Sequence, residues 1–390
     1  MNQPQPIIYI MFLIFAGTAV LSTLALLTRQ SLLVAYMALG AILGPWGFKF
    51  VTDSTLIKEA GDIGIIFLLF LLGLDLQPKT LLHSLRKMSS IALLSSLIFF
   101  IFGFGISLFF HFTLIESIIV GLAMMFSSTI IGLKLLPTTI LHHQHTGELM
   151  ISILLLQDLI AIAVLLVLHA IGDRAFSFND LGLIICSFPA LLLIGYLFQR
   201  FVLSKLLQWF DKIHEYIFIL SIGWCLCMAQ LGYHMGLTEE IGAFIAGVSL
   251  ATNPISLYIA DSLKPLRDFF LVIFFFFIGA SFNLDYVNVV ILPAFFLALS
   301  MLIAKPVVFG WLLNKLGEPK KLSWEVGVRL GQVSEFSLLI VFLALQTKLI
   351  TPAVNYAVQA ATILTFIVSC YWVGMRYPTP LAASDKLRRD

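Results

Sequence analysis

The stretch LMISILLLQDLIAIAVLLVL, residues 149–168, decides how this chain folds, because it is twenty residues long and carries one charged side chain. A helix of about 20 mostly apolar residues spans the hydrocarbon core of a bilayer. Asp158 is the tenth residue of the stretch, so we expect its carboxyl group near the middle of the membrane. A charge there costs about 2.5–3.5 kcal/mol on insertion scales, and by default it indicates a functional site.

The composition shows that the whole chain, like this stretch, is rich in apolar residues and poor in charged ones. Hydrophobic residues make up 60% of the sequence and charged residues 11%, and the mean hydropathy is +1.03. Soluble globular proteins carry about 25% charged residues, so we expect an all-α polytopic membrane protein. The apolar runs predict about thirteen spans, near 7–27, 31–48, 60–76, 88–110, 115–136, 148–170, 181–203, 214–232, 236–252, 265–283, 287–314, 323–346 and 352–374.

Lys and Arg residues predict the orientation, since they gather on the cytoplasmic side of membrane proteins. Of the 23 basic residues, Lys305 and Arg329 fall within spans. If the N-terminus is outside, the outer side holds four basic residues, and the remaining 17 are cytoplasmic. The outer four are Lys49, Lys58, Arg174 and Lys348. This bias favours an odd number of helices, with the C-terminus in the cytoplasm.

Two pairs of segments indicate an internal repeat. YMALGAILGPWG (36–47) is similar to EEIGAFIAGVSL (239–250), and GIIFLLFLLGLDL (64–76) is similar to LVIFFFFIGASFNL (271–284). Each pair is seven predicted helices apart, so its members cross the membrane in opposite directions. Chance similarity between apolar segments is the alternative, but two pairs at almost the same offset argue against it. Inverted-topology repeats are typical of secondary transporters.

Two spans at the same offset contain polar clusters in their middle, in MMFSSTIIG (124–132) and RLGQVSEFSLL (329–339). We expect these spans to be discontinuous helices that cross near the midplane and provide oxygen ligands for a cation. The alternative for the first cluster is that small polar residues only allow close helix packing. The candidate ligands are Ser127, Ser128, Thr129, Gln332, Ser334 and Glu335.

The charged residues inside the spans indicate ion exchange. Burial penalises a bare carboxylate and a nearby cation stabilises it, so Asp158 can hold either a proton or a metal cation. The carbonyl group of Gln157 can add a neutral ligand. Lys305 is either a charge partner of Asp158 or a snorkelling lysine. Glu335 either stabilises its broken helix or contacts the ion path, and we expect Arg329 to be an interfacial anchor.

Other polar residues carry weaker signals. The run LHHQHTGE (141–148) is interpreted as a solvated cytoplasmic loop, with a pH sensor or a metal site as alternatives. Asp62 and Asp75 are interpreted as structural residues at the ends of a span. The sequence contains no cofactor loop, nucleophile set or metal motif, so we expect neither enzymatic activity nor a resident cofactor.

Six motifs, in order along the chain, carry a family resemblance over about 7–375. They are FLLFLLGLDLQPKTL, MMFSSTIIGLKLL, LLLQDLIAIAVLL, IGAFIAGVSLA, PLRDFFLVIFFFFIGASF and GQVSEFSLLI. Together they resemble the monovalent cation:proton antiporter-2 family, in particular the transport domain of Kef-type potassium/proton antiporters. The resemblance implies a sodium/proton-antiporter-like fold, with a dimerisation part and a core that moves as an elevator. It also implies that Asp158 is the ion-binding carboxylate.

The resemblance carries further expectations. Residues 1–376 form the transmembrane antiporter domain, and 377–390 form a short cytoplasmic tail without a nucleotide-binding domain. The transported ions are K⁺ or Na⁺ and H⁺, and the pair Gln157–Asp158 goes with electroneutral exchange of potassium. We expect a homodimer in the lipid of a bacterial inner membrane, with no nucleic-acid partner. Whether a separate regulatory subunit binds is left open.

The sequence departs from Kef-type proteins in two places. Those proteins continue into a cytosolic nucleotide-binding domain, whereas this sequence ends at Asp390. The loop at 255–269, which is acidic in Kef-type proteins, retains only Asp261 and Asp268 as acids. The alternatives to potassium/proton exchange are a sodium/proton antiporter and a passive cation channel or non-transporting membrane sensor.

Overall fold

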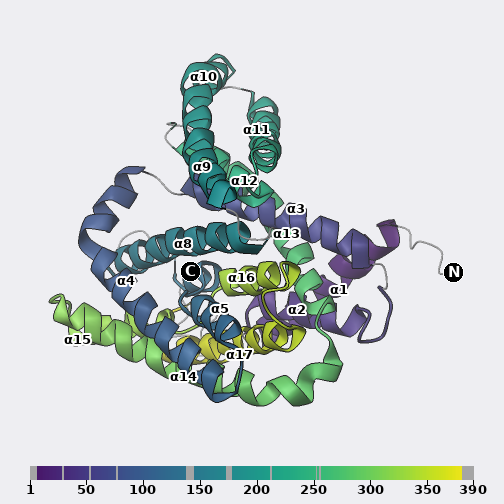
Figure 1. The fold of residues 1–390 in the computed structure, drawn as a ribbon, viewed down its shortest axis with the longest axis vertical. Coiled ribbons are helices and arrows are strands. Elements are labelled where there is room, and N and C mark those ends of the chain that lie inside the picture. Colours follow the sequence, from purple (N-terminus) through teal and green to yellow (C-terminus); the bar gives the residue numbers. More distant parts are fainter. Residues whose placement is uncertain are drawn as a thin grey trace.

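Helices form the regular secondary structure of the protein, as a computed structural model shows (Figure 1). The structure describes residues 7–28, 30–51, 54–75, 78–137, 145–172, 178–210, 213–251, 253 and 256–379. The helices up to the middle of the chain are α1 (Ile7–Leu27), α2 (Leu32–Leu43), α3 (Ser54–Asp75), α4 (Pro78–Phe109), α5 (Leu114–Met124), α6 (Thr129–Lys134), α8 (His145–Gly172) and α9 (Phe178–Phe198). The π-helix η1 (Gln199–Leu203) continues α9. The later helices are α10 (Ser204–Trp209), α11 (His214–His234), α12 (Glu239–Ala251), α13 (Ser256–Ala280), the 3₁₀ turn η2 (Leu284–Tyr286), α14 (Val287–Lys315), α15 (Lys320–Arg329), α16 (Glu335–Gln346) and α17 (Pro352–Arg376).

The predicted spans coincide with these helices. Eight helical segments of the described residues are long and apolar enough to cross a membrane, and three shorter apolar helices accompany them. The predicted spans 115–136 and 323–346 each contain two short helices with a break between them. The prediction of a helical polytopic membrane protein with two broken spans is therefore confirmed, whereas the count of thirteen spans stays a prediction.

The helices pack in two groups. We call α1, α2, α3, α9, α11, α12 and α13 the flanking group, and α4, α5, α8, α14, α15, α16 and α17 the crossing group. Packing is mainly within each group, and the groups meet where α8 contacts α9, where α17 contacts α2, and where Phe342 of α16 packs against Phe277 of α13. Figure 1 shows α9, α10 and α11 standing apart from the body that α4, α5, α14 and α17 form. The helix α17 ends at Arg376, and the predicted domain boundary at this residue stays a prediction. Most of the predicted tail, 380–390, lies outside the described residues.

The helix contacts follow the inverted repeat that the sequence predicts. In the repeat, α2 corresponds to α12 and α3 corresponds to α13. The helix α2 packs against α13, and the corresponding pair, α12 and α3, pack against each other in the same way. Both crossings need glycine. A Cβ atom on Gly40 of α2 would lie 2.0 Å from the carbonyl oxygen of Phe276 in α13. A Cβ atom on Gly247 of α12 would likewise lie 2.0 Å from the carbonyl oxygen of Phe70 in α3. These backbone contacts explain the glycine patterns of the repeat.

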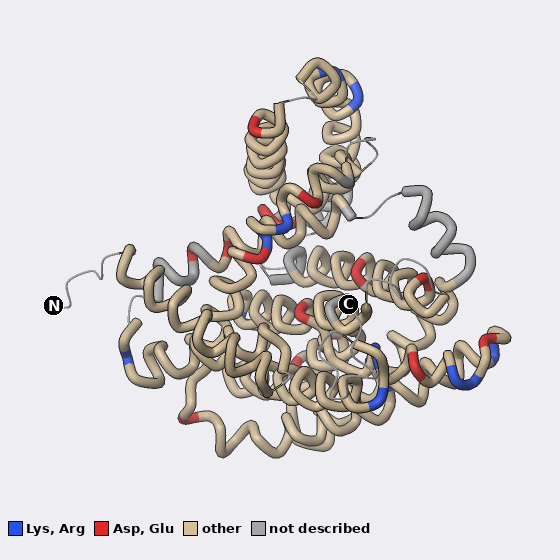
Figure 2. The backbone as a smooth tube through the Cα atoms, turned by 180° about the vertical axis from the view of Figure 1, so that it is seen from behind, with Lys and Arg blue, Asp and Glu red and all other residues tan. Residues whose placement is uncertain are grey.

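Charged residues are sparse along the helices. Figure 2 shows that most of the backbone carries neither acidic nor basic residues, with the basic positions gathered in a few places near helix ends. Few charged side chains are deeply buried in the described part of the chain, and Asp158, Lys305, Arg329 and Glu335 are at most 2% exposed. Their position in the fold therefore identifies the candidate site.

Candidate ion-binding site

Two helix breaks form the frame of the site. The first separates α5 from α6 after Met124, and the second separates α15 from α16 after Arg329. At each break a serine caps the second half-helix. The hydroxyl of Ser128 accepts from the N–H of Ile131 at 3.1 Å, and the hydroxyl of Ser334 accepts from the N–H of Phe336 at 3.1 Å. These caps satisfy backbone donors that the breaks release, as an apolar surrounding requires.

The two breaks contact each other directly. The Ser127 hydroxyl donates to the carbonyl oxygen of Leu330 at 2.9 Å. The Gln332 side-chain amide donates to the carbonyl oxygen of Ser128 at 3.3 Å. A further bond comes from the Ser337 hydroxyl, which donates to the carbonyl oxygen of Ala123. Segments about 200 residues apart in sequence are thus joined into one crossing, as the polar clusters predict.

Asp158 lies in α8 beside the first break and is completely buried. Its two carboxylate oxygens accept from the hydroxyl of Thr129, at 3.1 and 3.0 Å. Thr129 is the first residue of α6, so the break itself places this hydroxyl against the carboxylate. A hydroxyl has one hydrogen, and a carboxylate offers about four acceptor positions. Most of the acceptor capacity of Asp158 is therefore available to a proton or a cation.

Gln157 holds the backbone of the first break. Its side-chain oxygen accepts from the N–H of Ser127 at 3.1 Å, and its amide nitrogen donates to the carbonyl oxygen of Met125 at 3.4 Å. The sequence suggests that this oxygen is a cation ligand. In the structure the oxygen is engaged by a backbone donor, so Gln157 positions the break beside Asp158. A role as ligand stays a prediction.

Lys305 does not pair with Asp158 in this structure. No ion pair within 4.0 Å joins these two described residues. The Lys305 ammonium group donates to the carbonyl oxygens of Phe126 and Gln332, the latter at 3.0 Å, and to the hydroxyl of Ser127 at 3.3 Å. Both carbonyls lie where a first half-helix has ended, and such ends carry partial negative charge. The cation therefore neutralises the two breaks, which differs from the charge pairing that the sequence suggests.

Glu335 is a second buried carboxylate at the crossing. It is the first residue of α16, and one of its oxygens accepts from the N–H of Ile130 in α6 at 3.2 Å. The other oxygen is buried without a hydrogen-bond partner among the described residues. A carboxylate is stabilised beside helix N-termini, which fits the predicted role in stabilising a broken helix. Thr129 and Ile130 are adjacent, so Asp158 and Glu335 lie against the same turn of α6.

Some contacts of the crossing were not predicted. Thr365 and Ser369 of α17 reach the second break: the Thr365 hydroxyl accepts from the N–H of Val333 at 3.1 Å, and the Ser369 hydroxyl donates to the side-chain oxygen of Gln332 at 2.9 Å. Their signal in the sequence is a polar stripe at helical spacing. Asn355, Gln359, Thr362, Thr365 and Ser369 are all buried.

The interpretation of Arg329 as an interfacial anchor is wrong. Its side chain is fully buried and donates to the carbonyl oxygens of Leu135 at 3.1 Å and Pro378 at 2.9 Å, besides pairing with Glu325 at 3.0 Å. Leu135 ends α6, so Arg329 supplies a cation at the C-terminal end of that half-helix. The residue belongs to the framework of the crossing.

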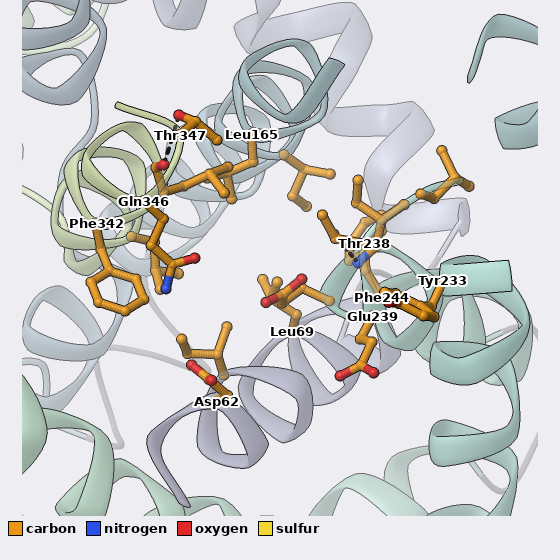
Figure 3. A pocket seen from close by; sticks show the side chains of 17 residues that line it. Asp62, Leu69, Leu165, Tyr233, Thr238, Glu239, Phe244, Phe342, Gln346 and Thr347 are labelled. Carbon is orange, nitrogen blue, oxygen red and sulfur yellow. Dashed lines mark hydrogen bonds between the residues drawn. The ribbon is translucent and has the colours of Figure 1, made fainter. Parts of the chain in front are cut away.

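A cavity of about 450 Å³ lies between the two helix groups. Its walls come from α3 and α12 of the flanking group and from α8 and α16 of the crossing group. Ile162, one turn beyond Asp158 in α8, lies in its lining. Three carboxylates, from Asp62, Glu239 and Glu240, also line it. Figure 3 shows Asp62, Glu239 and Gln346 around this cavity. Asp62, which the sequence suggests is a structural residue, therefore also lines the cavity.

The histidine run lies only in part within the described residues. Residues 138–144, which include two of its three histidines, are outside them. His145 contacts Glu148 at 3.0 Å and Glu318 at 2.9 Å on the surface. No cluster of metal-binding side chains occurs in the part of the chain that the structure describes. The interpretation as a polar loop and the alternative of a pH sensor stay predictions.

Comparisons with known proteins support the resemblance read from the sequence. The family described as "Sodium/hydrogen exchanger, transmembrane" matches residues 10–375. Three curated relatives from Arabidopsis thaliana are K(+) efflux antiporters 4, 5 and 6, with identities of 27%, 27% and 25% over 87% of this chain. The aligned part spans 59%, 61% and 58% of those relatives, so this chain corresponds to less than two thirds of their length.

A solved structure establishes the fold. The sodium proton antiporter MjNhaP1 from Methanocaldococcus jannaschii is similar to this chain with a TM-score of 0.70 and 18% sequence identity. The match covers 93% of this chain and 95% of that one. The predicted sodium/proton-antiporter-like fold is therefore confirmed.

Proposed function

This chain belongs to the sodium/hydrogen exchanger family, and we propose on that premise that it exchanges potassium ions for protons across a membrane. The observation that carries the proposal is the buried environment of the Asp158 carboxyl group. Its carboxyl group is fully buried in mid-span and has one hydroxyl donor, Thr129, and no cationic side chain as an ion-pair partner among the described residues.

Exchange follows from competition for this one carboxyl group. A bare carboxylate in an apolar interior is unstable, so Asp158 takes up either a proton or a cation when it is sealed from water. Binding of the cation displaces the proton, and binding of the proton displaces the cation. Because the loaded forms are favoured over the empty one, each half of the cycle carries one ion, and the two fluxes are coupled.

The proposed cation ligands come from the two helix breaks. Thr129 contributes a hydroxyl oxygen, and Ser127 and Ser128 contribute hydroxyl or carbonyl oxygens from the break. Glu335, Gln332 and Ser334 approach from the second break. Oxygen ligands of this kind suit a hard monovalent cation. Glu335 would act mainly by holding α6 through Ile130, while Asp158 exchanges its ligand.

Two features support a one-for-one, electroneutral exchange. Gln157, next to Asp158, is neutral and engaged with the backbone at Ser127 and Met125. Lys305 is engaged with carbonyl oxygens and is therefore not released when Asp158 changes partner. A single carboxyl group that alternates between a proton and a potassium ion moves no net charge over a cycle.

Alternating access is proposed to come from an elevator movement of the crossing group against the flanking group. The cavity between the groups supports this, since it reaches within one turn of Asp158 and is lined by Asp62, Glu239 and Glu240. Those carboxylates would raise the local cation concentration at the entrance. The flanking group would provide the homodimer interface. The distribution of basic residues supports an outer N-terminus, and a bacterial inner membrane is the proposed location.

Potassium is proposed because the curated relatives are named K(+) efflux antiporters. The test is reconstitution of the full chain in liposomes that contain a pH-sensitive dye, with imposed gradients of potassium, sodium or lithium. We expect a potassium gradient to drive counterflow of protons at a rate that does not change when the membrane potential is clamped. A response to sodium alone would make the protein a sodium/proton antiporter, and unitary currents in a planar bilayer would make it a channel.

A further inference from the structure

An apolar groove separates α5 from α8 on the surface of the crossing group. Its volume is about 470 Å³, within the 300–1,000 Å³ that is typical of ligand sites. The lining residues include Ile115, Ile118, Ile160, Ala163, Val167 and Leu349. Every one of these side chains is apolar. The groove exists because α4 and α16 pack against both helices, while α5 and α8 contact each other little.

The groove opens to the lipid-facing surface. Ile115 is 55% exposed, Val167 is 54% exposed and Ile118 is 38% exposed, although all three lie in apolar spans. Water is unstable in a hollow without polar partners, and an empty hollow forfeits dispersion contacts. In a membrane the hollow is therefore filled by the apolar groups around it, which are acyl chains.

A lysine precedes one of the residues that line the groove. Leu349 lines the groove and Lys348 precedes it, in the connection between α16 and α17. Lys348 has a left-handed backbone with φ of 59°, its side chain is exposed, and it makes no ion pair among the described residues. It is also one of only four basic residues on that side of the predicted topology. An apolar groove with an exposed cation next to one of its lining residues has the chemistry of a phospholipid site.

A carboxylate next to another lining residue is already engaged. Glu116 follows Ile115 and is 6% exposed. Its oxygens accept from the N–H and hydroxyl of Thr113, at 3.0 and 2.8 Å, and from the N–H and hydroxyl of Thr351, at 3.0 and 2.7 Å. These bonds fasten the start of α5 to the start of α17. The end of the groove is thus held in shape, and Glu116 and Lys348, both among the described residues, form no ion pair within 4.0 Å.

We propose that this groove binds one acyl chain of an anionic phospholipid whose headgroup phosphate contacts Lys348. The site lies on the face of α8 that points away from the Asp158 side chain. Ile160 follows Asp158 by two residues, which is about 3 Å along the helix axis and about 200° around it. A lipid in the groove therefore supports α8 on the face opposite the carboxyl group. This proposal requires only that the chain spans a membrane and does not depend on which ion it exchanges.

The experiment is native mass spectrometry of the full chain released from nanodiscs of phosphatidylcholine mixed with phosphatidylglycerol. A163W fills the groove, and K348Q removes the cation. The matched controls are I303W, at an exposed apolar position on α14, and K49Q, at another exposed lysine with a left-handed backbone. We expect the parent, I303W and K49Q to retain a bound phosphatidylglycerol and A163W to lose it.

K348Q separates the two parts of the site. We expect it to retain lipid without preferring phosphatidylglycerol over phosphatidylcholine. The proposal is overturned if A163W retains as much phosphatidylglycerol as the parent, or if the parent retains only detergent or no lipid. It is also overturned if the parent shows no preference for the anionic lipid. Because the readout is bound lipid, a failure here is distinct from a failure of ion exchange.

Discussion

The hydroxyl group of Thr129 donates to both carboxylate oxygens of Asp158, at 3.1 and 3.0 Å, across the first helix break. This contact joins the start of α6 to the middle of α8. It places an uncharged oxygen ligand within reach of any cation that Asp158 binds. The exchange mechanism proposed here depends on that geometry.

Replacing Thr129 therefore tests the contact. T129V removes the hydroxyl while keeping the shape of the side chain, and T129S keeps the hydroxyl. A hydrogen bond to a charged group is worth about 1.5–3 kcal/mol, so we expect T129V to raise the KM for potassium by about tenfold or more. T129S should stay close to the parent. An unchanged KM in T129V would show that the hydroxyl is no part of the cation site.

Gln157 is predicted to set the charge balance of the cycle. Q157E keeps an oxygen that can accept from the N–H of Ser127 and adds a second acidic group beside Asp158. We expect the parent rate to be independent of membrane potential and the Q157E rate to depend on it. The measurement is dye-reported exchange in liposomes at clamped potentials. Potential dependence in the parent would contradict electroneutral exchange.

Lys305 is predicted to stabilise the crossing independently of Asp158. K305M leaves the buried carbonyl oxygens of Phe126 and Gln332 without their donor, at a cost of about 1–3 kcal/mol for each. We expect K305M to lower the thermal unfolding temperature clearly and D158N to change it little. An ion pair between Lys305 and Asp158 would instead make both variants similarly unstable, because each would leave a buried charge unpaired.

The acidic cavity is predicted to concentrate cations on one side of the membrane. E239Q and E240Q should raise the KM for potassium entering from that side, by up to about fivefold at about 0.2–1 kcal/mol per exposed charge. The maximal rate should not change, and added salt should reduce the effect. E215Q, at the other end of α11, is the control. An equal effect on entry from both sides would exclude this cavity as the entrance.

The sequence was sufficient to predict a helical membrane protein, its two broken helices and the burial of Asp158 beside the first break. The signals are local: long apolar runs indicate spans, and a carboxylate or a serine cluster inside such a run indicates a polar site. The partners of Lys305 and Arg329 could not be predicted, because they are backbone carbonyls that become free only where helices end. The contact of Gln157 with the N–H of Ser127 could not be predicted for the same reason, because this N–H is unpaired only where the helix breaks.

The contribution of α17 depends on tertiary structure. Thr365 and Ser369 meet the second break only because α17 packs against α14 and α16. Their helical spacing indicates a polar face but does not identify what that face contacts. The glycine pattern of the repeat has a clearer physical reason, because Gly40 and Gly247 permit backbone contacts that a larger residue would prevent.

The most direct test of ion exchange at Asp158 is potassium-driven proton flux in liposomes that contain D158N. The substitution keeps the size of the side chain and removes the group that holds a proton or a cation. We predict that D158N unfolds at the temperature of the parent and shows no exchange above that of empty liposomes. Exchange by D158N as fast as by the parent would contradict the mechanism.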